Sequence, residues 1–294
     1  MEETKSSKNK GKNKYWLWLT TAVFVVMQSL PVQAQTVLES IEETGVLKVA
    51  VREDAAPFGY VDSAKNLQGY CLDFLALLEE KLKQKLKRNT LAVRLLKSTT
   101  SNRFQLIQQG LIDLECGPNT IRELSLSDVA FSRAFFNTEI QFLIAKEQED
   151  RIDLEGDLAD TSIGVIRNTG IEQLIRESYP LARLVLFSGI TARDRGVQAV
   201  EQGNIDAMAS DGILLKAEAA EQNLPVDEYI LIPQNTASFD NKLSANSDRY
   251  GMIIRGNDPQ WQDFINSVIS SKESQQLFKQ WFDLVESFPQ QSNN

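Results

Sequence analysis

The sequence of 294 residues contains no histidine. Histidine is the side chain most suited to proton transfer near neutral pH, and it is a frequent metal ligand. Its absence excludes histidine-based catalytic triads, histidine metal sites and acid/base catalysis by imidazole. We therefore expect no catalytic residue, no bound metal ion and no cofactor.

Cysteine is also scarce, since the chain has only Cys71 and Cys116, which are 45 residues apart. The two could pair after export to an oxidising compartment, where disulfides persist. Each also stands beside apolar residues typical of a core, where a free thiol behaves as a small hydrophobic side chain. The sequence leaves both outcomes open.

Long apolar runs are absent apart from one near the N-terminus, Trp16–Leu30. Five lysines precede this run and the small-residue sequence Val32-Gln-Ala34 follows it, which is the arrangement of a secretory signal peptide. The alternative is an uncleaved membrane anchor, but the run is shorter than the roughly 20 residues that a spanning helix needs. We expect residues 1–34 to be a signal peptide cleaved after Ala34, and the mature chain to be a soluble periplasmic protein.

Basic residues are fewer than acidic ones, 31 against 40. Removal of residues 1–34 takes away five lysines and two glutamates, which changes the net charge from −9 to −12. A chain this acidic is a poor nucleic-acid binder. About 260 residues remain, enough for two modest hydrophobic cores. We expect two lobes, a monomer and no nucleic-acid partner.

Strand-like and helix-like patterns alternate along the mature chain, which indicates an α/β protein with largely parallel sheets. The first set contains expected strands at 47–52, 91–96 and 111–116 and expected helices at 70–86 and 101–109. The second set contains strands at 161–167, 184–187 and 206–210 and helices that begin near 170 and span 192–202 and 212–221. The chain closes with a strand in 250–255 and amphipathic helices at 261–269 and 274–285.

Two long connections, 138–145 and 249–255, would each cross between the lobes and together form a hinge. This predicts a discontinuous lobe 1 made of residues 40–142 and 250–287, with lobe 2, residues 143–249, inserted into it. The last residues, 288–294, are polar and are expected to be a flexible tail.

The segment Asp113–Arg122 has a buried type of strand that runs directly into a Gly/Pro turn. Gly117 allows the backbone to approach a ligand closely, while Asn119 and Thr120 offer neutral hydrogen bonds. Arg122 offers a planar fork that matches a carboxylate. The turn is therefore predicted to hold a small anion.

Several short motifs carry a resemblance to a known family, namely Leu47–Phe58, Gly69–Phe74, Asn102-Arg103, Asp113–Gly117, Ala130-Phe-Ser132 and the closing helices. In this order and spacing they resemble the extracellular solute-binding proteins of polar amino-acid ABC importers, bacterial solute-binding protein family 3. The likeness is strongest to the glutamate/aspartate-binding branch and spans Leu47–Phe282. It implies a periplasmic-binding-protein type II fold, in which two α/β lobes, each a central sheet flanked by helices, are joined by two hinge strands and close over a ligand. It also implies an ABC transporter permease in the inner membrane as partner.

The resemblance implies roles for three arginines of the first lobe. Arg122 lies where the family supplies an arginine for the α-carboxylate of the ligand, and Arg52 and Arg103 match arginines that face the carboxylates of acidic amino acids. Arg52 could instead pair with Glu53 or Asp54. Arg122 and Arg103 could be ordinary surface charges.

In the second lobe the resemblance places the carboxylate of Asp211 on the ligand ammonium group, although Asp211 could also only cap the following helix. Arg193 lies near the position of another ligand-contacting polar residue, and it could equally be a solvated charge. Another helix begins near Gly170, and its free N–H groups favour an anion. The candidate binding residues at the start of that helix are Arg167, Asn168 and Thr169.

The charge count predicts the class of ligand. An α-amino acid needs one cation and one anion, which Arg122 and Asp211 would supply, so Arg52 and Arg103 are surplus for a neutral ligand. Buried arginines without partners are costly, and a second carboxylate on the ligand would satisfy them. We therefore expect glutamate or aspartate, with a broader range including glutamine and asparagine as the alternative. Phe58 would be an apolar wall against the ligand or part of the core.

A second functional class uses the same two-lobed architecture, because periplasmic enzymes of the cyclohexadienyl dehydratase kind share it. Such an enzyme needs a general acid, and Glu115 or Lys97 could be recruited to that role. Glu115 could equally be a structural partner of a cleft arginine. A third class is a ligand-sensing receptor domain, since Gly69–Asp73 also resembles ionotropic glutamate-receptor binding domains. We predict reversible binding and no enzymatic activity.

Overall fold

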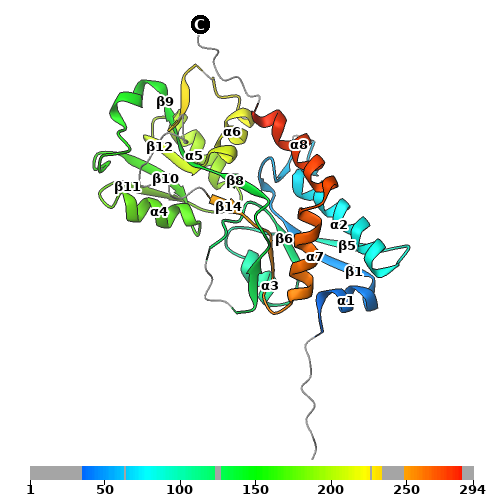
Figure 1. The fold of residues 1–294 in the computed structure, drawn as a ribbon. Coiled ribbons are helices and arrows are strands. Elements are labelled where there is room, and N and C mark those ends of the chain that lie inside the picture. The colour runs from blue at the N-terminus through cyan, green and yellow to red at the C-terminus, as the bar shows by residue number, and fades with distance from the viewer. Residues whose placement is uncertain (1–34, 63, 123–126, 226, 234–247, 287–294) are drawn as a thin grey trace, which may run out of the picture. The chain divides into compact units, whose positions relative to one another are not determined.

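The protein, drawn as a computed structural model in Figure 1, is organised around two sheets. Each sheet has five strands. The structure describes residues 35–62, 64–122, 127–225, 227–233 and 248–286. The expected signal peptide at 1–34 and the expected tail at 288–294 lie outside these residues. Within the described ranges, no helix is both long enough and apolar enough to cross a membrane.

The first sheet has the strand order β5-β1-β6-β15-β7 and forms the centre of lobe 1. Its strands are β1 (Val46–Val51), β5 (Ala92–Lys97), β6 (Leu114–Cys116), β7 (Val129–Phe131) and β15 (Ile253–Arg255). The helices of this lobe are α1 (Val37–Thr44), α2 (Tyr70–Leu86), α3 (Arg103–Gln108), α7 (Pro259–Ile269) and α8 (Lys272–Glu286). Side chains alternate along β1, so Val49 and Val51 join the core under α1, α2, α7 and α8, while Ala50 packs with Ile107 of α3. Helices α2 and α8 lie side by side (Figure 1).

The second sheet has the strand order β11-β10-β12-β9-β13 and forms the centre of lobe 2. Its strands are β9 (Ile140–Ala145), β10 (Ser162–Ile166), β11 (Arg183–Phe187), β12 (Ala207–Asp211) and β13 (Tyr229–Ile232). The helices are η1 (Lys146–Arg151), a 3₁₀-helix, α4 (Gly170–Ser178), α5 (Ala192–Glu201) and α6 (Gly212–Glu221). Residues of β9 again alternate between two cores, with Phe142 and Ile144 in one and Leu143 in the other.

Two short strands, β8 (Phe136–Thr138) and β14 (Asp248–Tyr250), join the lobes and pair with each other in antiparallel fashion. The chain passes from β8 into β9 of the second sheet and from β14 into β15 of the first. Because β9 belongs to the second sheet from Ile140 onward, we propose that lobe 2 begins there rather than at residue 143. A third small sheet, β2 (Asp54–Ala55), β3 (Gly59–Val61) and β4 (Leu67–Gln68), follows β1.

The expectation of largely parallel sheets is wrong, because both sheets are mixed. In the first, β1 runs parallel to β5 and β6, but β15 runs antiparallel to β6 and β7. In the second, β10 runs parallel to β11 and β12, but β9 runs antiparallel to β12 and β13. A parallel pair needs a crossover connection, whereas β9 and β15 follow directly on the joining strands and enter their sheets from the opposite end.

The other expected elements agree with the structure to within a few residues, and α2 and α6 match to the residue. The strand expected at 111–116 is shorter, because Leu111 and Ile112 donate their N–H groups to Leu106 and so end α3. The elements that the periodicity did not predict are α1, β2, β3, β4, β7, β13 and η1. Most of these are too short to show a period.

Gly69, directly before α2, occupies a conformation that only glycine tolerates. Its φ is +127°, and a Cβ atom there would collide with the backbone carbonyl of Phe58. We expect Gly69→Ala to lower the free energy of unfolding by about 2 kcal/mol or more, since backbone strain and a clash add. Gly110→Ala is the matched control, because Gly110 has φ +64° but its Cβ would meet nothing within 4 Å. Equal losses for the two variants in urea denaturation would show that the Phe58 contact is not important.

Candidate functional site

A small cavity lies at the carboxyl ends of parallel strands from both lobes, which is where open α/β sheets bind ligands. Arg52 follows β1, Gly117 follows β6, and Asp211 is the last residue of β12. The cavity has a volume of about 30 Å³. Its lining consists of Arg52, Thr100, Arg103, Pro118, Thr120, Ile166, Thr169, Gly170, Ile171, Arg193, Ala209, Ser210, Asp211 and Leu214.

Arg52 is buried at the cavity and is already bound by a protein carboxylate. Its Nε donates to Oδ1 of Asp54 at 2.6 Å, and its Nη2 donates to Oδ2 at 2.8 Å. Such a two-point pair is the strongest arrangement that an arginine and a carboxylate make. The expectation that Arg52 would lack a protein partner is therefore wrong, and the pairing with Asp54 is the alternative that the sequence left open.

Arg103, the first residue of α3, is different. Only 6% of it is exposed, its Nε has no hydrogen-bonding partner among the described residues, and its guanidinium lies over the ring of Phe104 at 5.2 Å. Burial, and to a smaller extent the nearby positive charge of Arg52, lower the pKa of this guanidinium to about 10. That Arg103 is a surplus cation kept for a ligand stays a prediction.

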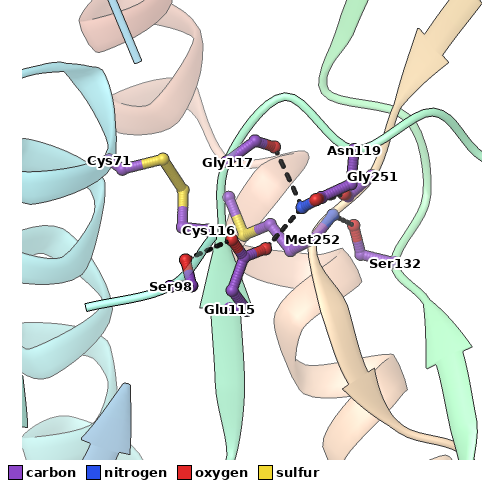
Figure 2. Close-up of a disulfide and its surroundings, with 9 residues drawn as sticks. All are labelled: Cys71, Ser98, Glu115, Cys116, Gly117, Asn119, Ser132, Gly251 and Met252. Carbon is purple, nitrogen blue, oxygen red and sulfur yellow. Dashed lines mark hydrogen bonds between the residues drawn. A yellow bond between two sulfur atoms is a disulfide. The ribbon is translucent and has the colours of Figure 1, made fainter. Parts of the chain in front are cut away.

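Glu115 of β6 is fully buried, and its charge acts on both arginines. One carboxylate oxygen accepts a hydrogen bond from Ser98 Oγ at 2.7 Å, and the other accepts from Asn119 Nδ2 (Figure 2). Its negative charge raises the pKa of both Arg52 and Arg103 against the effect of burial. Glu115 is therefore a fixed counter-ion below the cavity.

Gly117 stands in a crowded position at the start of the turn that Figure 2 shows. A Cβ there would lie 3.0 Å from Oε1 of Glu115 and 3.1 Å from Cγ of Arg52. Asn119 closes the turn by donating from Nδ2 to the carbonyl oxygen of Gly117 at 3.2 Å. Thr120 follows in the cavity lining and pairs with Tyr250 in an isolated β-bridge.

The two cysteines are joined by a disulfide, which decides the question that the sequence left open. Cys71 lies in the first turn of α2 and Cys116 at the end of β6, with their Cα atoms 5.7 Å apart (Figure 2). The bond fixes α2 to the strand whose next residue is Gly117. It therefore supports the floor of the cavity without lining it.

Three of the expected residues of lobe 2 line the cavity. Arg193 of α5 is buried, and its Nη1 donates to the backbone carbonyl oxygen of Asp54 in lobe 1 at 2.5 Å. Asp211 holds the N-cap position of α6, but its side chain makes no capping hydrogen bond to that helix. Thr169 caps α4 by accepting from the N–H of Glu172 at 3.2 Å.

Arg122 is exposed, and its guanidinium lies over the ring of Phe104 at 5.8 Å. It lines a wider hollow outside the cavity, and the two spaces share Thr100 and Thr169. Arg122 thus faces this hollow rather than the cavity, although its positive charge still acts to lower the pKa of Arg103. Thr100 was not predicted, although its position just after β5, at the same edge of the sheet, was a usable signal.

The three remaining candidates lie outside the cavity lining of the described chain. Arg167 is exposed, and so is Asn168, which donates from Nδ2 to Ser101 Oγ of the other lobe at 3.3 Å. Phe58 is fully buried in an aromatic core, edge-on to Phe136 and Tyr250. Its position agrees with the core alternative.

No group of three or more cysteine, aspartate or glutamate residues within metal-binding reach occurs among the described residues.

Comparisons with known proteins agree with this architecture. The sequence pattern of the bacterial extracellular solute-binding proteins, family 3, matches residues 47–284. The chain is 29% identical over 255 residues to the glutamate/aspartate import solute-binding protein of Salmonella typhimurium, which covers 85% of this chain and 79% of that protein. It is 28% identical over 278 residues to the L-glutamate/L-aspartate-binding protein of Pseudomonas aeruginosa, covering 90% and 86%.

Solved structures show the same fold. An ancestral amino acid-binding protein, described as a precursor of cyclohexadienyl dehydratase, superposes with a TM-score of 0.68 at 22% identity, covering 84% of this chain and 100% of that one. An amino acid ABC transporter substrate-binding protein from Streptococcus pneumoniae, bound to L-arginine, has a TM-score of 0.68 at 20% identity, covering 86% and 98%. At these identities the likeness establishes the two-lobed type II fold alone.

Proposed function

Because the chain belongs to the bacterial extracellular solute-binding proteins, family 3, and serves amino-acid import as a solute-binding component, we propose that its ligand is glutamate or aspartate. The ligand would bind in the cavity between the lobes. The two relatives named above, which bear glutamate and aspartate in their names, support this choice.

Arg103 is the observation that carries the proposal. A buried guanidinium whose Nε has no hydrogen-bonding partner among the described residues is costly, and a ligand carboxylate would reduce that cost. Two further buried arginines, Arg52 and Arg193, line the same cavity. The carboxylate of Asp211, on the opposite side, would accept from the ligand ammonium group.

Binding requires the lobes to move apart. A cavity of about 30 Å³ has room for roughly two water molecules, at about 10–15 Å³ each, and not for an amino acid. Since β8 and β14 are the strands that join the lobes, the lobes would rotate about these two strands when the cavity opens. Ligand contacts from both lobes would then favour the closed state by the difference between the affinities of the closed and open forms, and the permease would recognise the closed form.

Calorimetry of the mature protein with all twenty amino acids tests the proposal. We expect glutamate and aspartate to bind and lysine and arginine not to, because a cationic side chain would meet Arg103 and Arg193. Tight binding of arginine together with no heat from either acidic amino acid would reject the choice of ligand.

A neutral polar amino acid is the second candidate, and one observation favours it. Asp54 neutralises Arg52, so one of the arginines that the charge count assigned to the ligand already has a counter-ion. Glutamine or asparagine, which lack the second carboxylate, would then match the charge of the cavity. Parallel titrations with glutamate and glutamine compare the two ligands directly.

The dehydratase alternative finds less support. Lys97 is 74% exposed and forms an ion pair with Glu53 at 2.7 Å, and Glu115 is already occupied by Ser98 and Asn119. Neither Lys97 nor Glu115 belongs to the cavity lining. We therefore propose that the protein is not an enzyme, and that purified protein does not turn over prephenate or arogenate.

The proposed place of action is the periplasm, with an inner-membrane ABC permease as partner and the binding protein as a monomer. The disulfide supports an oxidising compartment, since such bonds are rare in the cytosol. We expect cleavage after Ala34, so that intact-mass measurement of the exported protein gives a chain that starts at Gln35. A mass that includes residues 1–34 would instead indicate a retained anchor.

A further inference from the structure

Charges of opposite sign are equal in number around the cavity. Three arginines lie there, each no more than 6% exposed. Three carboxylates lie beside them. The six residues are Arg52, Arg103, Arg193, Asp54, Glu115 and Asp211. A balanced site of this kind suits a zwitterion without net charge, whereas glutamate at neutral pH carries one net negative charge.

We propose that Asp54 is a specificity-determining residue that reduces the preference of the site for acidic over neutral amino acids by neutralising Arg52. The inference rests on the proposed function. It identifies the residue that sets how strongly the site distinguishes glutamate from glutamine, two ligands of the same length and nearly the same shape.

The geometry singles out Asp54 among the three carboxylates. Glu115 is held beneath the cavity by Ser98 and Asn119, and Asp211 faces from lobe 2. Asp54 instead occupies the Nε and Nη2 side of Arg52, a face of the guanidinium that would otherwise hold an anion by two parallel hydrogen bonds. The Nη1 group of Arg52 is the part left for a ligand.

Asp54 also lies between arginines of the two lobes. Its side chain binds Arg52 of lobe 1, and its backbone carbonyl oxygen accepts from Arg193 of lobe 2. Burial tends to raise the pKa of Asp54, but the charges of Arg52 and Arg193 and the hydrogen bonds from Arg52 outweigh it and lower the pKa. Asp54 therefore carries a full negative charge at neutral pH, and that charge acts on all three arginines.

The test is Asp54→Asn, which removes the charge and keeps the size of the side chain. The backbone contact to Arg193 remains available, because it uses the carbonyl oxygen. We expect the ratio of glutamate to glutamine affinity in calorimetry to rise by roughly tenfold, as expected for one unit charge removed within several ångströms of a ligand carboxylate. If the substitution only displaced Arg52, the affinities for glutamate and glutamine would fall alike and their ratio would stay unchanged.

Glu53→Gln is the matched control, because it removes one negative charge from the adjacent residue. Glu53 pairs with the exposed Lys97, whereas Asp54 pairs with Arg52 of the cavity lining. We expect its affinity ratio to equal that of the wild type. Asp54→Glu, which keeps the charge, should also preserve the ratio, and Asp54→Ser offers a second neutral variant if Asp54→Asn does not fold.

A ratio that is unchanged or lower in folded Asp54→Asn or Asp54→Ser would overturn the role of Asp54 while leaving the proposed function intact. A ratio that rises equally in Glu53→Gln would also overturn it, since the effect would then be one of overall charge. If the wild type and the variants bind none of glutamate, aspartate, glutamine and asparagine, the proposed function fails and this inference fails with it.

Discussion

Replacing Arg103 with methionine is expected to weaken glutamate binding by about 3 kcal/mol, roughly a hundredfold in Kd. The reason is that Arg103 is a buried cation of the cavity whose Nε has no hydrogen-bonding partner among the described residues, so a ligand carboxylate is its proposed partner. Methionine fills similar space without charge. Calorimetry with glutamate and glutamine measures the loss, which should be larger for glutamate.

The same replacement should make the unliganded protein more stable. Burial of Arg103 lowers its pKa to about 10, which shows that the charged form is disfavoured where it lies. Removal of a buried charge that is disfavoured in this way is expected to raise the free energy of unfolding by about 1 kcal/mol or more in urea denaturation. Opposite effects on binding and on stability are the signature of a residue kept for its ligand.

Arg94→Met is the control for this prediction, because Arg94 is an exposed arginine on β5 of the same sheet. It should change neither glutamate affinity nor stability by more than about 0.5 kcal/mol, as is usual for surface positions. If Arg103→Met binds glutamate as the wild type does, the carboxylate site lies elsewhere. If it also loses stability, Arg103 is a structural residue.

Much of the fold was predictable because its elements repeat a strong pattern. The helix at Tyr70–Leu86 has apolar residues on one face and lysines on the other, and it forms as expected. The gathering of three candidate residues around one cavity was predictable for a similar reason. Residues directly after parallel strands meet at one edge of a sheet, and Arg52, Arg103 and Asp211 do line one cavity.

Pairwise partners could not be predicted in the same way. The sequence left Glu53 and Asp54 as equal alternatives for Arg52, and only the turn into β2 decides that Asp54 faces the guanidinium while Glu53 faces Lys97. The charge count from sequence therefore overestimated the surplus of cations. Arg122 differs from the expectation for a related reason, since the turn that carries it directs its side chain over Phe104.

Loss of the Cys71–Cys116 disulfide is expected to have the largest effect on stability. The bond closes a loop of 45 residues, so its removal should cost about 4 kcal/mol through the entropy of the unfolded chain. For a protein of this size that loss corresponds to a fall in Tm of roughly 10 °C. Calorimetric melting of Cys71→Ala, Cys116→Ala and the double variant measures it.

Comparison of the single and double variants separates the stabilisation by the disulfide bond from that by local packing of the two side chains. Either substitution alone breaks the bond, so each single variant should lose nearly as much stability as the double variant. Losses that simply add would instead show that packing of the two side chains dominates. Glutamate affinity should change far less than stability, because the turn after Cys116 is also held by Asn119 and Glu115, whose hydrogen bonds do not depend on the disulfide. A large loss of affinity in folded Cys71→Ala would mean that the tether, rather than those hydrogen bonds, positions the floor of the cavity.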